Sequence, residues 1–235
     1  MLVQQGDART NQVDQYLASI LAAVAGALNV AAFNAVGFFS ANMTGNVSLL
    51  SDHIARSHIV TGIFFLFILL AFIGGSAIST LIISGGVRRN VISIYAVNIL
   101  AESLLLALLG VIVLFLGDKA KAHTLILGLS FLMGFQNAVV TRISHARVRT
   151  THISGIATDI GIELGHLFDI ARGAGASDTR EESKSKLVLH IWTILSFLVG
   201  GIIGALFYQL IGISVLFIAS VVLFVISLHS IAKAV

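Results

Sequence analysis

Two short polar stretches, each containing a glycine, interrupt an otherwise apolar chain and have the composition of a solute-binding site. They are Asn42-Met43-Thr44-Gly45-Asn46 and Thr151-His152-Ile153-Ser154-Gly155. Asn, Thr and Ser side chains compete for backbone hydrogen bonds, and glycine adopts conformations that other residues avoid. A helix that restarts after such a break offers unpaired N–H groups and partial positive charge, which attract anions and carbonyl oxygens. The alternative is a kink whose polar groups are satisfied within the chain.

Each break predicts a new helix. Thr44 is predicted to cap a helix that runs through Val47–Ala55, and Ser154 is predicted to cap a helix from Gly155 to about Ile170. The same tripeptide, Asn-Ala-Val, precedes both breaks, beginning at Asn34 and at Asn137. The predicted solute-binding residues are therefore Asn34, Asn42, Thr44, Gly45, Asn46, Asn137, His152, Ser154 and Gly155. For the two repeated asparagines, helix packing is an equally good explanation.

The helix after the second break is predicted to be amphipathic. Asp159, Glu163 and His166 share one of its faces, opposite Ile160 and Leu164. Such a face predicts a solvated surface or the lining of a water-filled vestibule. Two carboxylates and one imidazole without a fixed motif are a weak metal signal, so we expect no metal site and no other cofactor.

Glu102 stands among leucines near the middle of a long apolar segment, with Asn98 and Tyr95 on the preceding turns. A charge at the bilayer centre costs at least about 2.5–3.5 kcal/mol, so such residues usually face the bundle interior and serve function. We predict that Glu102 carries the proton of a coupled transport step. The alternative is a hydrogen-bonded packing residue.

The composition is that of a protein that crosses a membrane several times. Apolar residues make up 57% of the 235 and charged residues 11%, whereas soluble domains average about 25% charged. The absence of cysteine excludes disulfides and thiol catalysis. A net charge of +3 is too small to indicate nucleic-acid binding. No nucleophile–base spacing is recognisable, so we expect no enzymatic activity.

Six segments are long and apolar enough to span a bilayer as helices. They are about Tyr16–Phe39, Ile59–Ile83, Val91–Leu116, Ala122–Val140, Leu187–Leu210 and Gly212–Ile231. With the N-terminus in the cytoplasm, the 14 Lys and Arg residues all fall on the cytoplasmic side except Arg56, Lys119 and Lys121. The positive-inside rule therefore predicts that both termini are cytoplasmic. The basic cluster of Arg142, Arg147 and Arg149 is explained by this topology, or alternatively by anionic lipid or an anionic substrate.

The order of breaks and spans predicts an internal duplication within one membrane domain over residues 1–235. The first repeat covers residues 14–116 and the second 121–235, with a solvated cytoplasmic linker at 171–186. Because each half contains three spans, an odd number, the two halves must insert into the membrane in opposite orientations. This is the inverted-repeat pattern of many secondary transporters. Glycines within the apolar segments predict close helix contacts inside the protein, with a homodimer contact as the alternative. They are Gly26, Gly74, Gly75, Gly85, Gly86, Gly200, Gly201 and Gly204.

The motifs resemble a known family. Ala41-Asn42-Met43-Thr44-Gly45-Asn46, Gly134-Phe135-Gln136-Asn137-Ala138 and Arg149-Thr150-Thr151-His152-Ile153-Ser154-Gly155 are similar to the YoaK-type bacterial integral membrane proteins. The resemblance covers nearly the whole chain. It implies a protein of the bacterial inner membrane with about six spans, and it implies no substrate.

These observations predict an all-α polytopic membrane protein whose two inverted three-helix repeats each contain an interrupted helix. The expected function is that of a small secondary transporter, proton-coupled through Glu102, for a small polar or anionic solute. A passive channel and a non-transporting subunit or sensor are the alternatives. A channel requires a continuous polar lining, which the last span lacks because serines are its main polar residues before His229.

Overall fold

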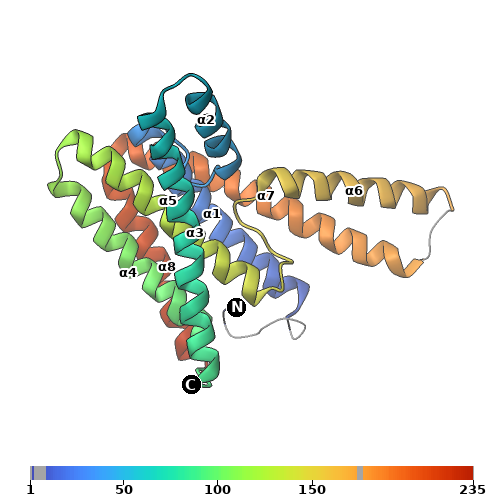
Figure 1. The fold of residues 1–235 in the computed structure, drawn as a ribbon. Coiled ribbons are helices and arrows are strands. Elements are labelled where there is room, and N and C mark those ends of the chain that lie inside the picture. Colours follow the sequence, from blue (N-terminus) through green and yellow to red (C-terminus); the bar gives the residue numbers. More distant parts are fainter. Residues whose placement is uncertain (1, 3–8, 174–176, 235) are drawn as a thin grey trace.

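The computed structural model describes residues 2, 9–173 and 177–234, and within these residues every regular element is a helix (Figure 1). The all-α prediction is confirmed. The elements are α1 (Asn11–Val36), α2 (Met43–Ala55), α3 (Ile59–Arg88), α4 (Ile94–Phe115), α5 (Asp118–Ile143), α6 (Ile153–Ala171), α7 (Ser177–Ile211), the 3₁₀ turn η2 (Gly212–Ser214) and α8 (Val215–Ala232).

Five stretches of the described chain are long and apolar enough to cross a membrane. They are Asn11–Val36, Ile59–Arg88, Ile94–Phe115, Ala120–Ile143 and Arg180–Ala232. The last stretch contains both α7 and α8, so the six expected spans fall on α1, α3, α4, α5, α7 and α8. The two helices that follow the breaks, α2 and α6, are not among these stretches.

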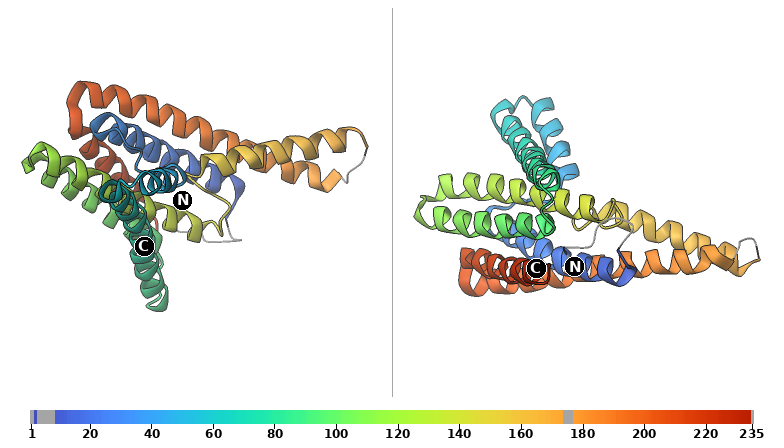
Figure 2. Two further views of the ribbon diagram at one scale, coloured as in Figure 1. Left: turned by 45° about the horizontal axis from the view of Figure 1, so that its top comes forward. Right: turned by 90° about the horizontal axis from the view of Figure 1, so that it is seen from below.

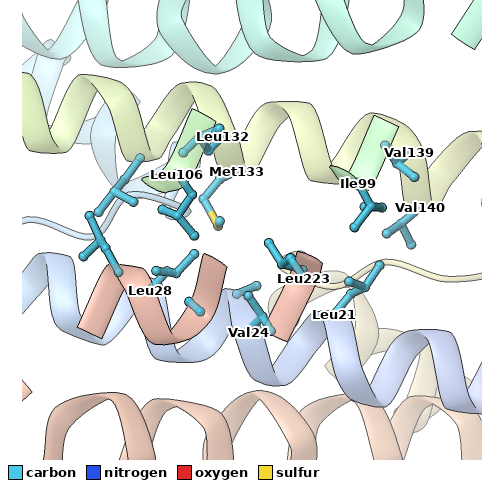
Figure 3. Packing of buried hydrophobic residues seen from close by; sticks show 14 of the residues in the cluster. Leu21, Val24, Leu28, Ile99, Leu106, Leu132, Met133, Val139, Val140 and Leu223 are labelled. Carbon is cyan, nitrogen blue, oxygen red and sulfur yellow. The ribbon is translucent and has the colours of Figure 1, made fainter. Parts of the chain in front are cut away.

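The long helices pack as pairs. Helix α1 lies along α7, α3 lies along α5, and α4 lies along α8, while the short helices α2 and α6 pack on α3 and α7 (Figure 2). Helix α6 and the first half of α7 extend together beyond the other helices. Between the long helices lies a core of buried aliphatic side chains from α1, α4, α5 and α8, among them Leu28, Leu106, Met133 and Leu223 (Figure 3). Long apolar side chains outside this core, such as Phe115 and Leu210, are exposed, as expected for a surface that faces lipid.

Glycines allow the backbones of these pairs to touch. A Cβ atom at Gly75 on α3 would overlap the Phe131 carbonyl on α5, and one at Gly200 on α7 would overlap the Ala23 carbonyl on α1. A Cβ atom at Gly204, one turn beyond Gly200, would also overlap the backbone of Ala27. Most of the predicted glycine contacts thus form inside the chain. The prediction was wrong for Gly74 and Gly85, because nothing lies within 4 Å of either Cβ position.

The expected linker at 171–186 differs in the structure. Helix α7 begins at Ser177, so most of this interval is helical, and residues 174–176 lie outside the described part. Ion pairs one helical turn apart, Lys184 with Glu181 and Lys186 with Glu182, support the helix there. Most of the interval expected to be a solvated linker is therefore the charged first part of α7.

Gly75→Ala is expected to lower the thermal stability of the protein, because the added methyl group meets the α5 backbone, which has little room to move. Overpacking of a close-packed interior typically costs about 1–3 kcal/mol. Gly74→Ala is the matched control and is expected to leave stability unchanged or slightly raised, since its methyl group enters open space. Thermal unfolding in detergent, followed by the fluorescence of Trp192, measures both variants. Equal melting temperatures would contradict the observed α3–α5 contact.

Candidate functional site

The first break begins where α1 ends at Gly37, which has a left-handed backbone (φ 77°) and donates its N–H to the Phe33 carbonyl. Asn42 then caps α2, and its side-chain oxygen accepts the N–H of Gly45 at 3.0 Å. The predicted cap, Thr44, was therefore wrong: Asn42 stands three residues before Gly45, which is the spacing a cap requires. The Asn29 side chain on α1 accepts the N–H of Ala41 at 2.9 Å and ties the break to the helix before it.

The second break follows α5 through a loop in which His145 and Ala146 have positive φ. Helix α6 starts after His152, and no side chain caps its first turn. The predicted Ser154 cap was wrong, because the helix begins at Ile153 and Ser154 lies inside it. The hydroxyl of Thr151 donates to the Asn137 side-chain oxygen on α5 at 3.0 Å. An asparagine of the preceding helix thus holds each break.

The two breaks meet at one cavity of about 890 Å³. Six of the nine predicted solute-binding residues line it: Asn42, Thr44, Gly45, Asn137, His152 and Ser154. The sequence reasoning did not single out the aromatic part of the wall, which consists of Phe39, Phe72 and Phe197. These rings come from the first break, from α3 and from α7, and no sequence spacing connects them.

Three predicted residues do not line this cavity. Asn34 lies five residues after Asn29 on α1, so its side chain points about 140° away, and its amide donates to the Val30 carbonyl. Asn46 is buried and donates to the Phe39 carbonyl at 3.5 Å. Gly155 lies behind the His152 ring, which occupies the space that a Cβ atom would need.

Arg149 is the cation of this cavity and forms no hydrogen bond or ion pair within the described part of the chain. Its neighbours in the basic cluster are engaged. Arg142 donates to the Thr80 carbonyl and the Ser84 hydroxyl on α3, and Arg147 pairs with Asp14 at 3.2 Å. The cluster therefore separates into two structural arginines and one whose guanidinium is open to the cavity.

A second cavity of about 680 Å³ lies between the start of α1, α6, α7 and the loop before α6, and Arg149 lines it too. Asp159 and Glu163 of α6 face it together with His190 of α7. The polar face of α6 is thus turned toward α7, while Leu164 on the opposite face is exposed. His166 is exposed and does not line the cavity, and no group of three or more metal-binding side chains occurs in the part of the chain the structure describes.

Glu102 lies away from both cavities, in the interior between α4 and α5. Its carboxyl accepts a hydrogen bond from the Gln136 amide at 3.1 Å. Asn98, one turn earlier on α4, donates to the Ser79 hydroxyl on α3 at 2.9 Å. Since Asn137 lines the main cavity and directly follows Gln136, helix α5 connects the buried carboxyl with that cavity.

The fold and the spans define an integral membrane protein built from long apolar helices and two short helices that follow breaks. The chain belongs to a family described as "Protein of unknown function (DUF1275)", whose model matches residues 17–229. It is 30% identical over 192 residues to the UPF0700 transmembrane protein YoaK of Bacillus subtilis (strain 168), covering 81% of this chain and 82% of that protein. No solved structure matches the chain.

Thr151→Val is expected to destabilise the protein by about 1 kcal/mol, because it leaves the Asn137 oxygen without its donor and releases the second break from α5. Thr158→Val is the matched control, since the Thr158 hydroxyl makes only an exposed bond to the Ser154 carbonyl within α6. Thermal unfolding in detergent measures both. If Thr158→Val lowers the stability as much as Thr151→Val does, the bond from Thr151 to Asn137 has no special role in holding the break.

Proposed function

We propose that this protein is a small secondary transporter that binds a small anionic solute in the cavity between its two broken helices. The observation that carries this proposal is Arg149, an unpaired guanidinium at a cavity to which both breaks contribute. We place the protein in the bacterial inner membrane with both termini in the cytoplasm, from the distribution of Lys and Arg and from its bacterial relative.

The chemistry of the cavity suits an anion. A guanidinium donates up to five hydrogen bonds in a planar fork that matches carboxylate and phosphate groups. The uncapped first turn of α6 adds backbone N–H donors and the positive end of a helix dipole beside it. The asparagine, threonine and serine side chains around it supply neutral hydrogen bonds, and the three phenylalanines exclude water. A volume of about 890 Å³ is within the usual range for small-molecule sites.

The arrangement of helices supports alternating access. Helix α1 pairs with α7 while α5 pairs with α3, and the short helices α2 and α6 pack on α3 and α7 in the same relation. If α1, α2, α3 and α4 exchange places with α5, α6, α7 and α8 in that order, each of these pairings becomes another observed pairing. Two related repeats would produce such a pattern. Transporters of this kind place the solute between discontinuous helices at the interface of their repeats.

We also propose that Glu102 carries the coupled proton. The carboxyl is buried in the interior, and its hydrogen bond from Gln136 connects it to α5, the helix whose Asn137 lines the cavity. A change in the charge of Glu102 alters its bond to Gln136 and so acts on the helix that carries Asn137. In this proposal the coupling group lies beside the solute path rather than in it.

Arg149→Gln is expected to weaken solute binding by about tenfold or more, since a hydrogen bond to a charged group contributes about 1.5–3 kcal/mol. The measurement is thermal stabilisation of the purified protein by potassium salts of acetate, lactate, phosphate and sulfate, because a ligand that binds the folded state raises its stability. Arg56→Gln is the control, since Arg56 is exposed on the far end of α2 and pairs only with Asp52. If the four salts stabilise Arg149→Gln as much as they stabilise the native protein, an anion site at Arg149 is excluded.

Glu102→Gln is expected to abolish solute accumulation driven by a pH gradient while exchange of solute across the membrane continues, because glutamine keeps the shape of the side chain but cannot release a proton. Uptake by proteoliposomes with and without the gradient measures this, with Asp52→Asn as the control. Full gradient-driven uptake by Glu102→Gln would remove Glu102 from coupling. Ionic conductance in planar bilayers would instead favour a channel, and ligand binding without any flux would favour a sensor.

A further inference from the structure

Three oxygen atoms in the fully buried cluster around Glu102 have no hydrogen-bond partner. They are Glu102 Oε2, Asn98 Oδ1 and Gln136 Oε1. None of the three residues is exposed. Unpaired polar atoms in such surroundings are costly, so buried groups of this kind normally have a partner.

The observed orientation of the amide groups makes the most hydrogen bonds. The Asn98 nitrogen donates to the Ser79 hydroxyl and, at 3.2 Å, to the Ser79 carbonyl. Turning this amide over would leave the Ser79 hydroxyl as its one donor and would place the amide oxygen against the Ser79 carbonyl oxygen, which cannot donate. The Gln136 nitrogen already donates to Glu102 Oε1. Both amide oxygens therefore remain buried acceptors without a donor.

No basic side chain supplies the missing positive charge. Within the described residues Glu102 has no ion pair, and the guanidinium of Arg142 on the neighbouring α5 is used by Thr80 and Ser84. A proton on Glu102 Oε2 would create one donor, which can serve only one of the two amide oxygens. A metal cation, in contrast, accepts lone pairs from all three oxygens at once.

We propose that Glu102, Asn98 and Gln136 form a binding site for Na⁺. Hard cations select carboxylate and amide oxygens. One carboxylate balances one positive charge, whereas a divalent ion would leave net charge in an apolar interior. Asn98 and Glu102 are four residues apart on α4, which places their side chains on one face, and Gln136 approaches from α5. Bound Na⁺ would join these helices and, through the bond from Asn98 to Ser79, α3.

This site rests on and deepens the proposed function, because Na⁺ and the proton would compete for the same carboxylate of Glu102 and a gradient of either ion could drive transport. The inference that the cluster binds Na⁺ does not itself require transport. A protein that binds Na⁺ but moves no solute would retain this site and lose the proposed function. A protein that moves solute without responding to Na⁺ would retain the proposed transport function and would have no Na⁺ site.

The test is thermal unfolding of the purified protein in detergent, titrated with NaCl, KCl or choline chloride at constant total chloride. Constant chloride keeps any effect of an anion at Arg149 equal in the three series. NaCl is expected to raise the melting temperature of the native protein above the other two salts. Equilibrium dialysis with radioactive sodium measures binding directly and needs no variant.

Glu102→Gln is expected to raise the half-saturating Na⁺ concentration by about tenfold or more. Gln136→Leu, which removes one oxygen, serves as a second variant if the first does not fold. Glu163→Gln is the matched control, because the Glu163 carboxyl also has a buried oxygen without a partner but lies on α6, away from Glu102. The Na⁺ response of Glu163→Gln should equal that of the native protein. Identical melting curves in the three salts, or an unchanged Na⁺ response in Glu102→Gln, would overturn the assignment.

Discussion

The structure depends on one constraint, which is that backbone polar groups left free where a helix is interrupted must find partners within the protein. Inside the protein, a helix can be interrupted only where neighbouring side chains replace the lost bonds. Asn29 and Asn42 do this at the first break, and Asn137 does it at the second. Because the required partners come from the helices before the breaks, each break is held against its own helix, and the two meet across one cavity.

Arg149 and Glu102 form no ion pair within the described part of the chain, and each lacks a different partner. Arg149 faces a cavity of about 890 Å³, while Glu102 lies in a fully buried cluster with three unpartnered oxygen atoms. The hydrogen bond from Gln136 to Glu102 and the bond from Thr151 to Asn137 attach adjacent residues of α5 to these two sites. The helix is therefore the physical connection through which occupancy of one site can affect the other.

Predictions from the sequence were right where a run of residues is compatible with one kind of local structure. Long apolar runs predicted the helices, because nothing else buries such runs in a bilayer, and Gly45 and Asn42 marked a real break. Predictions were wrong where several neighbours compete for one role. Thr44 and Ser154 are good capping residues, but the caps depend on where each helix begins. Asn34 repeats the motif of Asn137, yet Asn29 does the corresponding work because it lies on the side of α1 that faces the break.

The sequence by itself determined the membrane class, the positions of the two breaks and the family, since these follow from composition, from local breaks in helical pattern and from motif residues. Only the tertiary structure decided which residues surround the cavity. Phe72 and Phe197 come from helices far apart in the chain, and Arg149 became distinct from Arg142 and Arg147 only through their partners on α3 and α1. Partners of this kind depend on distances between helices, which local sequence does not encode.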